Sequence, residues 1–211
     1  MRLFVDTCVW RYWLTLKNSI LFDKSDFEKH AEDFDKIYEI VSFEPLKYVF
    51  LYDARVEGEL PDCYLSDHKM AFSQIKENSF CKKVPIPLSR ADGTYKLDGS
   101  LLGGGKFGGV LRDMLSMDGY DHEKAFQTAV PNIKLENPAH TKPRKKEFDI
   151  EHLESALEAD ADLFITADQP LIDRLNRAHG LFTDNLAVKR AYEICVTPSQ
   201  ALNIVLQSRS R

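Results

Sequence analysis

Three short apolar runs, each followed closely by a carboxylate, constrain the fold of this chain more than any other feature. They are residues 2–5 before Asp6, residues 48–52 before Asp53, and residues 163–166 before Asp168. Each run has the length and the β-rich composition of a buried strand. Acidic groups just past the carboxyl ends of strands occupy the place where open α/β sheets bind ligands. The pattern therefore predicts a sheet with acidic groups along one edge.

Amphipathic stretches with helical spacing lie between the predicted strands. Helices are expected over residues 26–41, 54–59, 149–160, 169–178 and 185–192 and from Pro198 onward, and further short strands over 181–182 and 194–196. Because strands joined by helical crossovers pair in parallel, we expect an α/β fold with three layers, α/β/α, around a central parallel sheet.

Local signals set several helix ends in this prediction. Asp53 is expected to cap the helix over 54–59, and a further helix is expected to begin near residues 66–68. Gly180 is expected to stop the helix over 169–178, because glycine is the residue that most often ends a helix.

Residues 82–147 differ in composition from the rest of the chain. Glycine and proline are concentrated there, so turn and loop chemistry dominates the segment. With 211 residues and 44% hydrophobic content, the chain is long enough for one substantial core. We expect a single domain over residues 1–211 that carries the Gly/Pro-rich segment 82–147 as an insertion or small subdomain.

The formal net charge of −5 gives no global basic signature. Any nucleic-acid contact must therefore come from a local patch. The best candidate patch lies just before Asp149 and consists of Lys142, Arg144, Lys145 and Lys146. These side chains would contact phosphates without sequence choice, and a solvated surface is an equally good interpretation of the same run.

The cysteines and the apolar segments bear on where the protein acts. Four widely spaced cysteines with no C-x-x-C pair argue against a zinc ribbon and against a disulfide framework. No stretch approaches the roughly 18 apolar residues of a membrane span, and the apolar core of a signal peptide is absent. We expect a cytoplasmic protein with no membrane partner.

A gathered set of carboxylates is also a chemical signal. Several carboxylates at one sheet edge repel one another, and a cation relieves that repulsion. Ligands that are all oxygen atoms favour Mg²⁺ or Mn²⁺. Such an ion makes water nucleophilic near neutral pH and neutralises charge on a phosphodiester, so the pattern is typical of phosphoester hydrolysis.

Three short motifs follow one another along the chain at suggestive spacing. They are Val5-Asp6-Thr7 at the start, Thr166-Ala167-Asp168 with Asp149 nineteen positions before Asp168, and the closing run Val196-Thr197-Pro198-Ser199-Gln200-Ala201-Leu202. In this order they resemble the PIN domain family of metal-dependent ribonucleases. The similarity covers roughly residues 1–60 and 148–206, and the segment between them matches no part of that family.

The resemblance implies an endoribonuclease that hydrolyses RNA phosphodiester bonds with Mg²⁺ or Mn²⁺ at four acidic positions. Asp6, Glu59, Asp149 and Asp168 fit the four positions. Asp6 and Asp168 are expected to bind the metal directly, while Glu59 and Asp149 complete the cage or orient metal-bound water. Glu57 is a rival for Glu59, because residues two apart on a helix cannot share one face.

Other residues have supporting roles in this expectation. Thr7 and Thr166 could supply a hydroxyl that orients a ligand, and Asp173 is a candidate fifth acid near the cleft. His152, three residues after Asp149, is a candidate lining residue. Helix capping is the alternative role for Asp149, and it could coexist with metal binding.

Different functions remain open at this stage. One is a PIN-like RNA-binding or protein-binding module with weak or no nuclease activity. Another is a phosphatase of the haloacid dehalogenase type, but Cys8 stands where that chemistry needs a second aspartate. Within the nuclease hypothesis, a toxin-type enzyme with an antitoxin-like protein partner and a homodimer are both compatible with the sequence.

Overall fold

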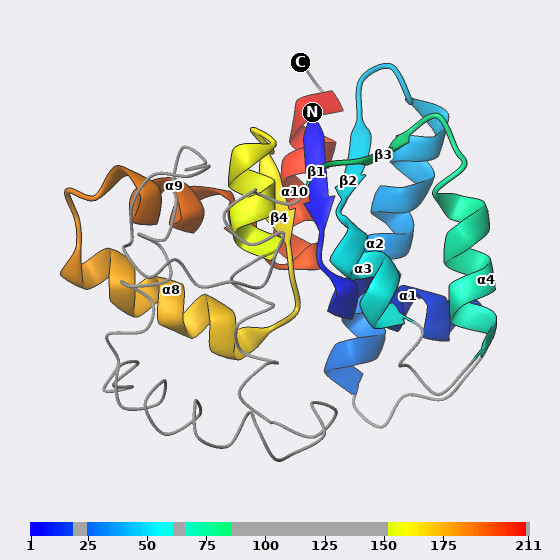
Figure 1. Cartoon of the computed structure of the whole chain (residues 1–211), viewed down its shortest axis with the longest axis horizontal. Helices are drawn as coiled ribbons and strands as arrows, with labels where there is room; N and C mark the ends of the chain where they lie inside the picture. Colours follow the sequence, from blue (N-terminus) through cyan, green and yellow to red (C-terminus); the bar gives the residue numbers. More distant parts are fainter. Residues whose placement is uncertain (19–24, 61–65, 86–151, 210–211) are drawn as a thin grey trace, which may run out of the picture.

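A computed structural model describes residues 1–18, 25–60, 66–85 and 152–209. Its centre is a five-stranded, all-parallel sheet with the strand order β3-β2-β1-β4-β5 (Figure 1). The strands are β1 (Arg2–Val5), β2 (Val49–Tyr52), β3 (Cys81–Lys83), β4 (Leu163–Ile165) and β5 (Cys195–Val196). The predicted α/β class with a central parallel sheet is confirmed.

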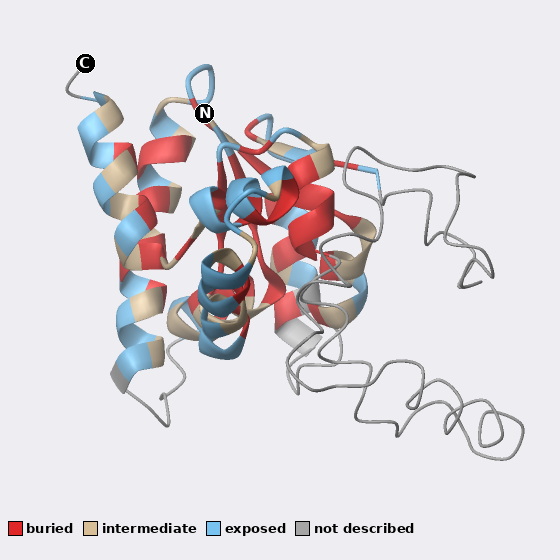
Figure 2. Cartoon of the chain, turned by 90° about the vertical axis from the view of Figure 1, so that its left-hand side faces the viewer, coloured by how far each residue is buried: buried red, intermediate tan, exposed pale blue. Residues whose placement is uncertain are grey.

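Helices cover both faces of the sheet and make the fold a three-layer α/β/α sandwich. One face packs against α1 (Thr7–Lys17), α2 (Ser25–Phe43), α4 (Ser66–Ile75) and α10 (Pro198–Arg209), and the other against helical residues 152–158, α8 (Gln169–Leu181) and α9 (Leu186–Ile194). The short α3 (Ala54–Glu59) follows β2. In Figure 2 the buried strands run between helices whose outer faces are exposed.

The central strand β1 shows how the two cores arise from alternation along a strand. Leu3 and Val5 pack into the core beneath α1 and α2, while Phe4 between them packs into the core on the opposite face. All three side chains are completely buried. Because β1 is covered on both sides, its sequence is a continuous apolar run rather than an alternating one.

Aromatic rings fill the core beneath α1 and α2. Trp10 contacts Trp13, Phe34, Phe50 and Phe72 edge-on, with ring centroids between 5.1 and 5.9 Å apart. Edge-to-face contacts of this kind are favoured by the quadrupoles of the rings. This cluster ties α1, α2, β2 and α4 to one another.

The strand order indicates where a ligand-binding site is expected in this sheet. Leu3 pairs with Phe50 of β2 on one side and with Leu163 of β4 on the other, so the chain order reverses between β1 and β4. Ligands of open parallel sheets bind outside the carboxyl ends of the strands at such a reversal. At that end, the amide of Asp6 donates to the carbonyl of Ile165 at 3.0 Å.

Two predicted features at the end of α8 are wrong. The helix continues through Gly180 to Leu181, and no strand forms over residues 181–182; the amide of Phe182 instead donates to the carbonyl of Ala178 at 2.8 Å. Glycine costs a helix only about 1 kcal/mol relative to alanine. Packing of buried Leu175 and Ala178 maintains the helix across it.

Two elements were not among those predicted. The helix α1 begins directly after Asp6, and β3 adds an edge strand to the sheet next to β2. Lys82 and Lys83 of β3 belong to the range 82–147 expected as an insertion, so the sheet continues into that range. Residues 86–147 lie outside the described part of the chain.

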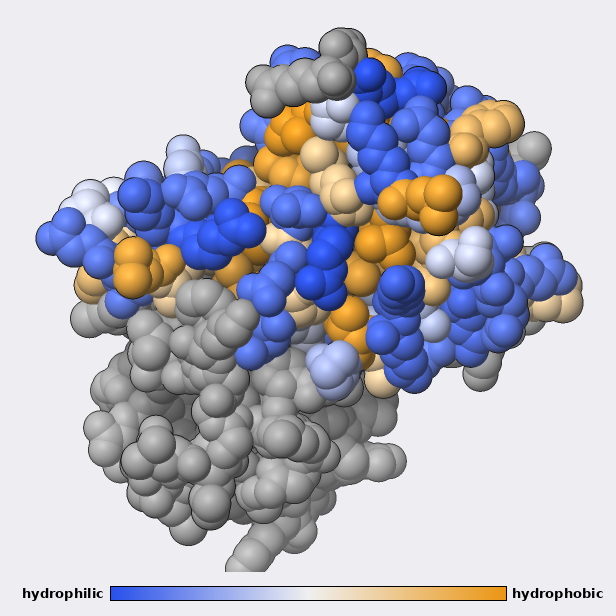
Figure 3. Space-filling view, turned by 90° about the horizontal axis from the view of Figure 1, so that it is seen from above, coloured by the Kyte–Doolittle hydropathy of each residue, from blue (hydrophilic) through white to orange (hydrophobic). Residues whose placement is uncertain are grey.

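Hydrophilic side chains dominate the described surface on one face of the molecule (Figure 3). On the face that carries both chain ends, hydrophobic side chains form small patches between hydrophilic ones (Figure 3). In the ranges that the structure describes, no helix combines the length and apolarity that crossing a membrane requires.

We predict that Phe50→Ala lowers the free energy of unfolding by about 3–5 kcal/mol, because it opens a cavity in the aromatic core. Urea unfolding followed by circular dichroism measures the change. Phe43→Ala is the matched control, since Phe43 is 83% exposed and its removal should cost less than about 0.5 kcal/mol. Equal losses for both variants would contradict this assignment of the core.

Candidate active site at the carboxyl edge of the sheet

Asp6 is a buried carboxylate at the end of the central strand. Its side chain is 2% exposed and accepts hydrogen bonds at Oδ2 from the Thr166 hydroxyl at 2.6 Å and from the Cys8 thiol at 3.2 Å. Asp6 precedes α1, yet its side chain makes no capping hydrogen bond to that helix. Burial raises its pKa, against the lowering effect of His152. Helix capping therefore does not explain this acid.

Thr166 connects Asp6 to Asp168. Its hydroxyl donates to Asp6 and accepts from the Asp168 amide at 3.0 Å, so the ends of β1 and β4 are linked through one side chain. The Asp168 carboxylate is partly buried and accepts from the amide of Leu171 at 2.9 Å, which caps α8. The capping bond uses Oδ1, so capping does not by itself prevent the other oxygen from binding a ligand.

Glu59 stands at the end of α3 and reaches the same edge. Its Oε1 lies 3.1 Å from Nε2 of His152, and that nitrogen lies 3.4 Å from the Thr7 hydroxyl. The Glu59 side chain is 31% exposed, whereas that of His152 is 1% exposed. The charge of Glu59 also acts on Asp6 and raises its pKa. The structure thus brings Thr7, Glu59 and Asp6 near one buried histidine.

The second nitrogen of His152 faces the Asp53 carboxylate. Nδ1 lies 3.4 Å from Oδ1 of Asp53, which is completely buried. The separation is that of an ion pair rather than of a well-formed hydrogen bond. Burial lowers the pKa of His152, but its contacts with Asp53 and Glu59 and the charge of Asp6 outweigh burial and raise the pKa to about 10. His152 is therefore an imidazolium at neutral pH.

Asp53 anchors this network to α3. As predicted, it caps the helix, with Oδ1 accepting from the amides of Arg55 at 2.9 Å and Val56 at 3.2 Å. Its Oδ2 also accepts two bonds from the Arg55 guanidinium, at 3.0 and 2.7 Å, and that guanidinium bonds Ser155 of the helix over 152–158. Although burial opposes it, the contacts with His152 and Arg55 hold the pKa of Asp53 far below its ordinary value.

Sequence reasoning did not predict the ion-paired role of His152 or Arg55. The available signal was weak: Arg55 stands two residues after a strand-end aspartate, and His152 stands three after Asp149. Neither spacing shows that the two side chains converge on one carboxylate. That convergence depends on packing between segments about a hundred residues apart.

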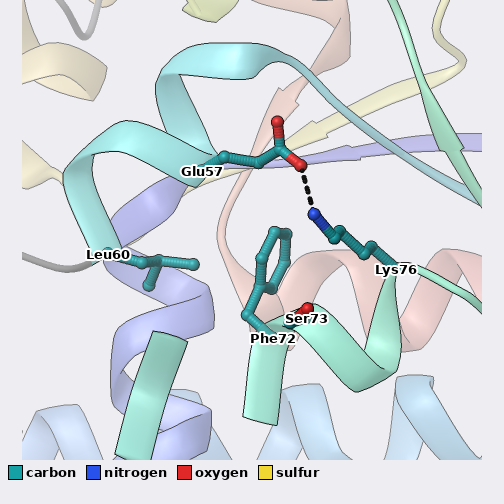
Figure 4. A pocket seen from close by; sticks show the side chains of 5 residues that line it. All are labelled: Glu57, Leu60, Phe72, Ser73 and Lys76. Atoms are coloured by element: carbon teal, nitrogen blue, oxygen red, sulfur yellow. Dashed lines mark hydrogen bonds and ion pairs between the residues drawn. The ribbon is translucent and has the colours of Figure 1, made fainter. Parts of the chain in front are cut away.

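Glu57, the rival of Glu59, has different partners. Its carboxylate accepts from Lys76, which directly follows α4, at 2.9 Å and pairs with Lys83 of β3. Figure 4 shows Glu57 above a pocket that Lys76 also lines, with the remaining walls formed by Leu60, Phe72 and Ser73. The structure therefore places Glu59 beside His152 and Thr7, and Glu57 over the pocket between α3 and α4.

The remaining candidates divide into two groups. Asp173 is exposed on α8, where it accepts from the Gln169 side chain at 2.7 Å. The others, namely Asp149, Lys142, Arg144, Lys145 and Lys146, lie outside the described residues. Helical residues 152–158 continue the helix expected from Asp149 onward.

The donor chemistry at this edge fits an oxygen-binding divalent cation better than zinc. Within the described ranges, no group of three or more His, Cys, Asp or Glu side chains is arranged to hold a metal ion. Mg²⁺ keeps several waters and takes only one or two carboxylates directly, so Asp6 and Asp168 would be enough protein ligands. Zinc sites need at least three protein ligands. The Cys8 thiol donates to Asp6, and burial raises the pKa of that thiol well above its ordinary value.

Comparison with known proteins yields no relative. No protein-family model matches the chain, and no curated protein or solved structure does.

We predict that stability falls with rising pH above about pH 7. The pKa of His152 is raised from 6.5 to about 10, so the folded state keeps a proton that the unfolded state releases. This contribution is complete below the unfolded pKa and is lost as the pH rises toward the folded one. The slope should approach about 1.4 kcal/mol per pH unit between about pH 7 and pH 8.

Urea unfolding at several pH values across this interval measures the slope. His152→Gln should lower stability and flatten the dependence, because glutamine does not titrate. Measuring below about pH 8 limits interference from the cysteines, whose ordinary pKa is about 8.5. A wild-type protein with constant stability over the interval would show that the buried imidazole is neutral.

Proposed function

We propose that this chain is a PIN-like, divalent-metal-dependent endoribonuclease. The observation that carries the proposal is the junction of β1 and β4, where buried Asp6 is joined to Asp168 through the hydroxyl of Thr166. This junction lies where the strand order reverses, which is the ligand-binding position of open parallel sheets. The chain order of the acids and their strands supports the PIN-like assignment.

The acids at this edge support the proposal because they can bind a divalent cation, and the cation can in turn bind an anionic phosphodiester. Asp6 lies in a buried setting that raises its pKa, and a cation beside it would favour its ionised form. When bound, Mg²⁺ or Mn²⁺ would supply charge neutralisation on the phosphoryl oxygens and an acidified water. Asp6 and Asp168 would hold the ion, and Asp149 is proposed as a further ligand.

The chain's own residues fix this arrangement. Thr166 holds Oδ2 of Asp6, which limits the rotation of the carboxylate. His152 holds Glu59 from the opposite side, so Glu59 faces the edge in one orientation. Glu59 would orient water, because its partner His152 already neutralises its charge.

RNA is the proposed substrate, and Lys142, Arg144, Lys145 and Lys146 are proposed phosphate contacts. A toxin-type role with an antitoxin-like partner, a homodimer and action in the cytoplasm belong to the same proposal. These finer assignments rest on the sequence resemblance alone.

The rival function is a PIN-like module that binds RNA or protein without cutting. One observation favours it: within the described ranges, no group of three or more His, Cys, Asp or Glu side chains is arranged to hold a metal ion. Calorimetric titration with Mn²⁺ separates the two, since a binding module has no need of the ion at this edge. Loss of Mn²⁺ binding in Asp6→Asn would support the nuclease.

We predict that Asp6→Asn and Asp168→Asn each reduce the rate of RNA cleavage on the order of 100-fold or more, because each removes a charged ligand. Gel analysis of structured and unstructured RNAs, with Mn²⁺ or with EDTA, measures the rate. Asp184→Asn is the matched control, since Asp184 is exposed in the turn between α8 and α9. Wild-type cleavage rates in both site variants, with folding intact, would overturn the assignment.

We predict that Glu59→Gln and Glu57→Gln separate in their effects. Glu59→Gln should lower the cleavage rate with little change in Mn²⁺ affinity, because Glu59 orients rather than binds. Glu57→Gln should leave cleavage unchanged and lower stability slightly, since it weakens two ion pairs with partly exposed lysines. The reverse pattern of rates would identify Glu57 as the acid of the site.

A further inference from the structure

Tyr12 is a residue of α1, the helix that begins directly after Asp6. It stands four residues after Cys8, whose thiol donates to Asp6. Residues four apart share one helix face and are separated by about 6 Å along the axis. Tyr12 therefore lies one helical turn from the proposed cleavage site, and its side chain is partly exposed.

Electrostatic contacts place the Tyr12 hydroxyl near the same acids. Burial is the main cause that raises its pKa to about 12, and the charges of Cys8, Asp168 and Asp6 add to it, while Arg11 acts in the opposite sense. The hydroxyl thus stays protonated, and the charges of both carboxylates and of Arg11 act on it. The guanidinium of Arg11 is a group that can contact the phosphate backbone of a nucleic acid.

The ring of Tyr12 forms a flat pair with Phe27 of α2. The ring centroids are 4.5 Å apart and the planes differ by 15°. The rings around Trp10 in the core instead meet edge-on and are almost completely buried. Each ring of a flat pair has one π-face turned away from its partner, and the bases of single-stranded nucleic acids stack on such faces.

We propose that the stacked Tyr12–Phe27 pair is a platform for one base of a single-stranded RNA whose adjacent phosphate lies at Asp6 and Asp168. The inference rests on the proposed nuclease function and names its substrate class. Bases in a duplex are already stacked and cannot lie on a protein ring, whereas unpaired bases can. The platform therefore selects unpaired RNA and sets which phosphodiester bond reaches the acids.

The test uses the full chain with Mn²⁺ and a fluorescent oligouridine whose linkages resist hydrolysis, so that no cleavage occurs. Anisotropy gives the affinity for the intact oligomer and for versions with one abasic position moved along the strand. For the wild type, one abasic position should weaken binding roughly 5- to 150-fold, the effect of losing one stacked base. Tyr12→Leu should weaken binding of the intact oligomer similarly and lose the sensitivity to that position.

Two further variants separate stacking from folding. Tyr12→Phe keeps the ring and should keep the abasic sensitivity. Tyr192→Leu is the matched control, because Tyr192 also belongs to a flat, partly exposed pair, with His179 at 4.1 Å and 6°, but stands just before the amino end of β5. It should bind every oligomer as the wild type does, and thermal unfolding should show that all variants fold.

Wild-type binding in Tyr12→Leu, or an equal loss for intact and abasic oligomers at every position, would overturn the platform. A wild type that cuts RNA but shows one of these results leaves the nuclease standing and rejects the platform alone. A wild type that neither binds nor cuts RNA rejects both.

Discussion

β1 pairs in parallel with strands from two distant parts of the chain, β2 on one side and β4 on the other. Every feature of the candidate site depends on this pairing. It places the residue after β1 within reach of the residues after β4, so the Thr166 hydroxyl meets Asp6 at 2.6 Å. It also brings α3, which follows β2, to the same edge. A shift in register of one residue would turn every side chain of β1 to the wrong face.

The second organising element is the buried ion network around His152. Buried charges are costly to desolvate, and the attraction between them repays that cost only when the geometry is good. Here the Asp53 carboxylate accepts hydrogen bonds from two backbone amides and from the Arg55 guanidinium, and it forms an ion pair with the His152 imidazolium. Few of its lone pairs are therefore left without a partner. The same imidazolium fixes Glu59. The position of Glu59 on α3 therefore depends on how the helix over 152–158, which carries His152, packs against the sheet.

Strong local signals made much of the fold predictable. β1 and β4 are short apolar runs, α2 has a clear helical period, and Asp53 is a capping residue in the right place. The edge strand β3 was missed because two of its three residues are lysines, and pairing with β2 compensates for the absence of an apolar pattern. The extent of α8 was underestimated because tertiary packing outweighed the intrinsic cost of Gly180.

The site was less predictable than the fold, because its geometry depends on contacts between distant segments. Sequence pattern singled out Asp6 and Asp168, since a carboxylate after a buried strand is visible locally. It left Glu57 and Glu59 unresolved, as both stand on the same short helix. Their partners separate them: those of Glu57 come from the turn after α4 and from β3, and that of Glu59 comes from the helix over 152–158.

This division of partners has an electrostatic consequence. Glu59 and Asp53 share the positive charge of His152, so their need for a further cation is small. Asp6 is different: its bonds come from a neutral hydroxyl and a thiol, and burial raises its pKa. A divalent cation is attracted most strongly to a carboxylate that has no positively charged group in direct contact with it. In the proposed nuclease the metal would therefore bind at the junction of β1 and β4, which is also where the strand order of the sheet reverses.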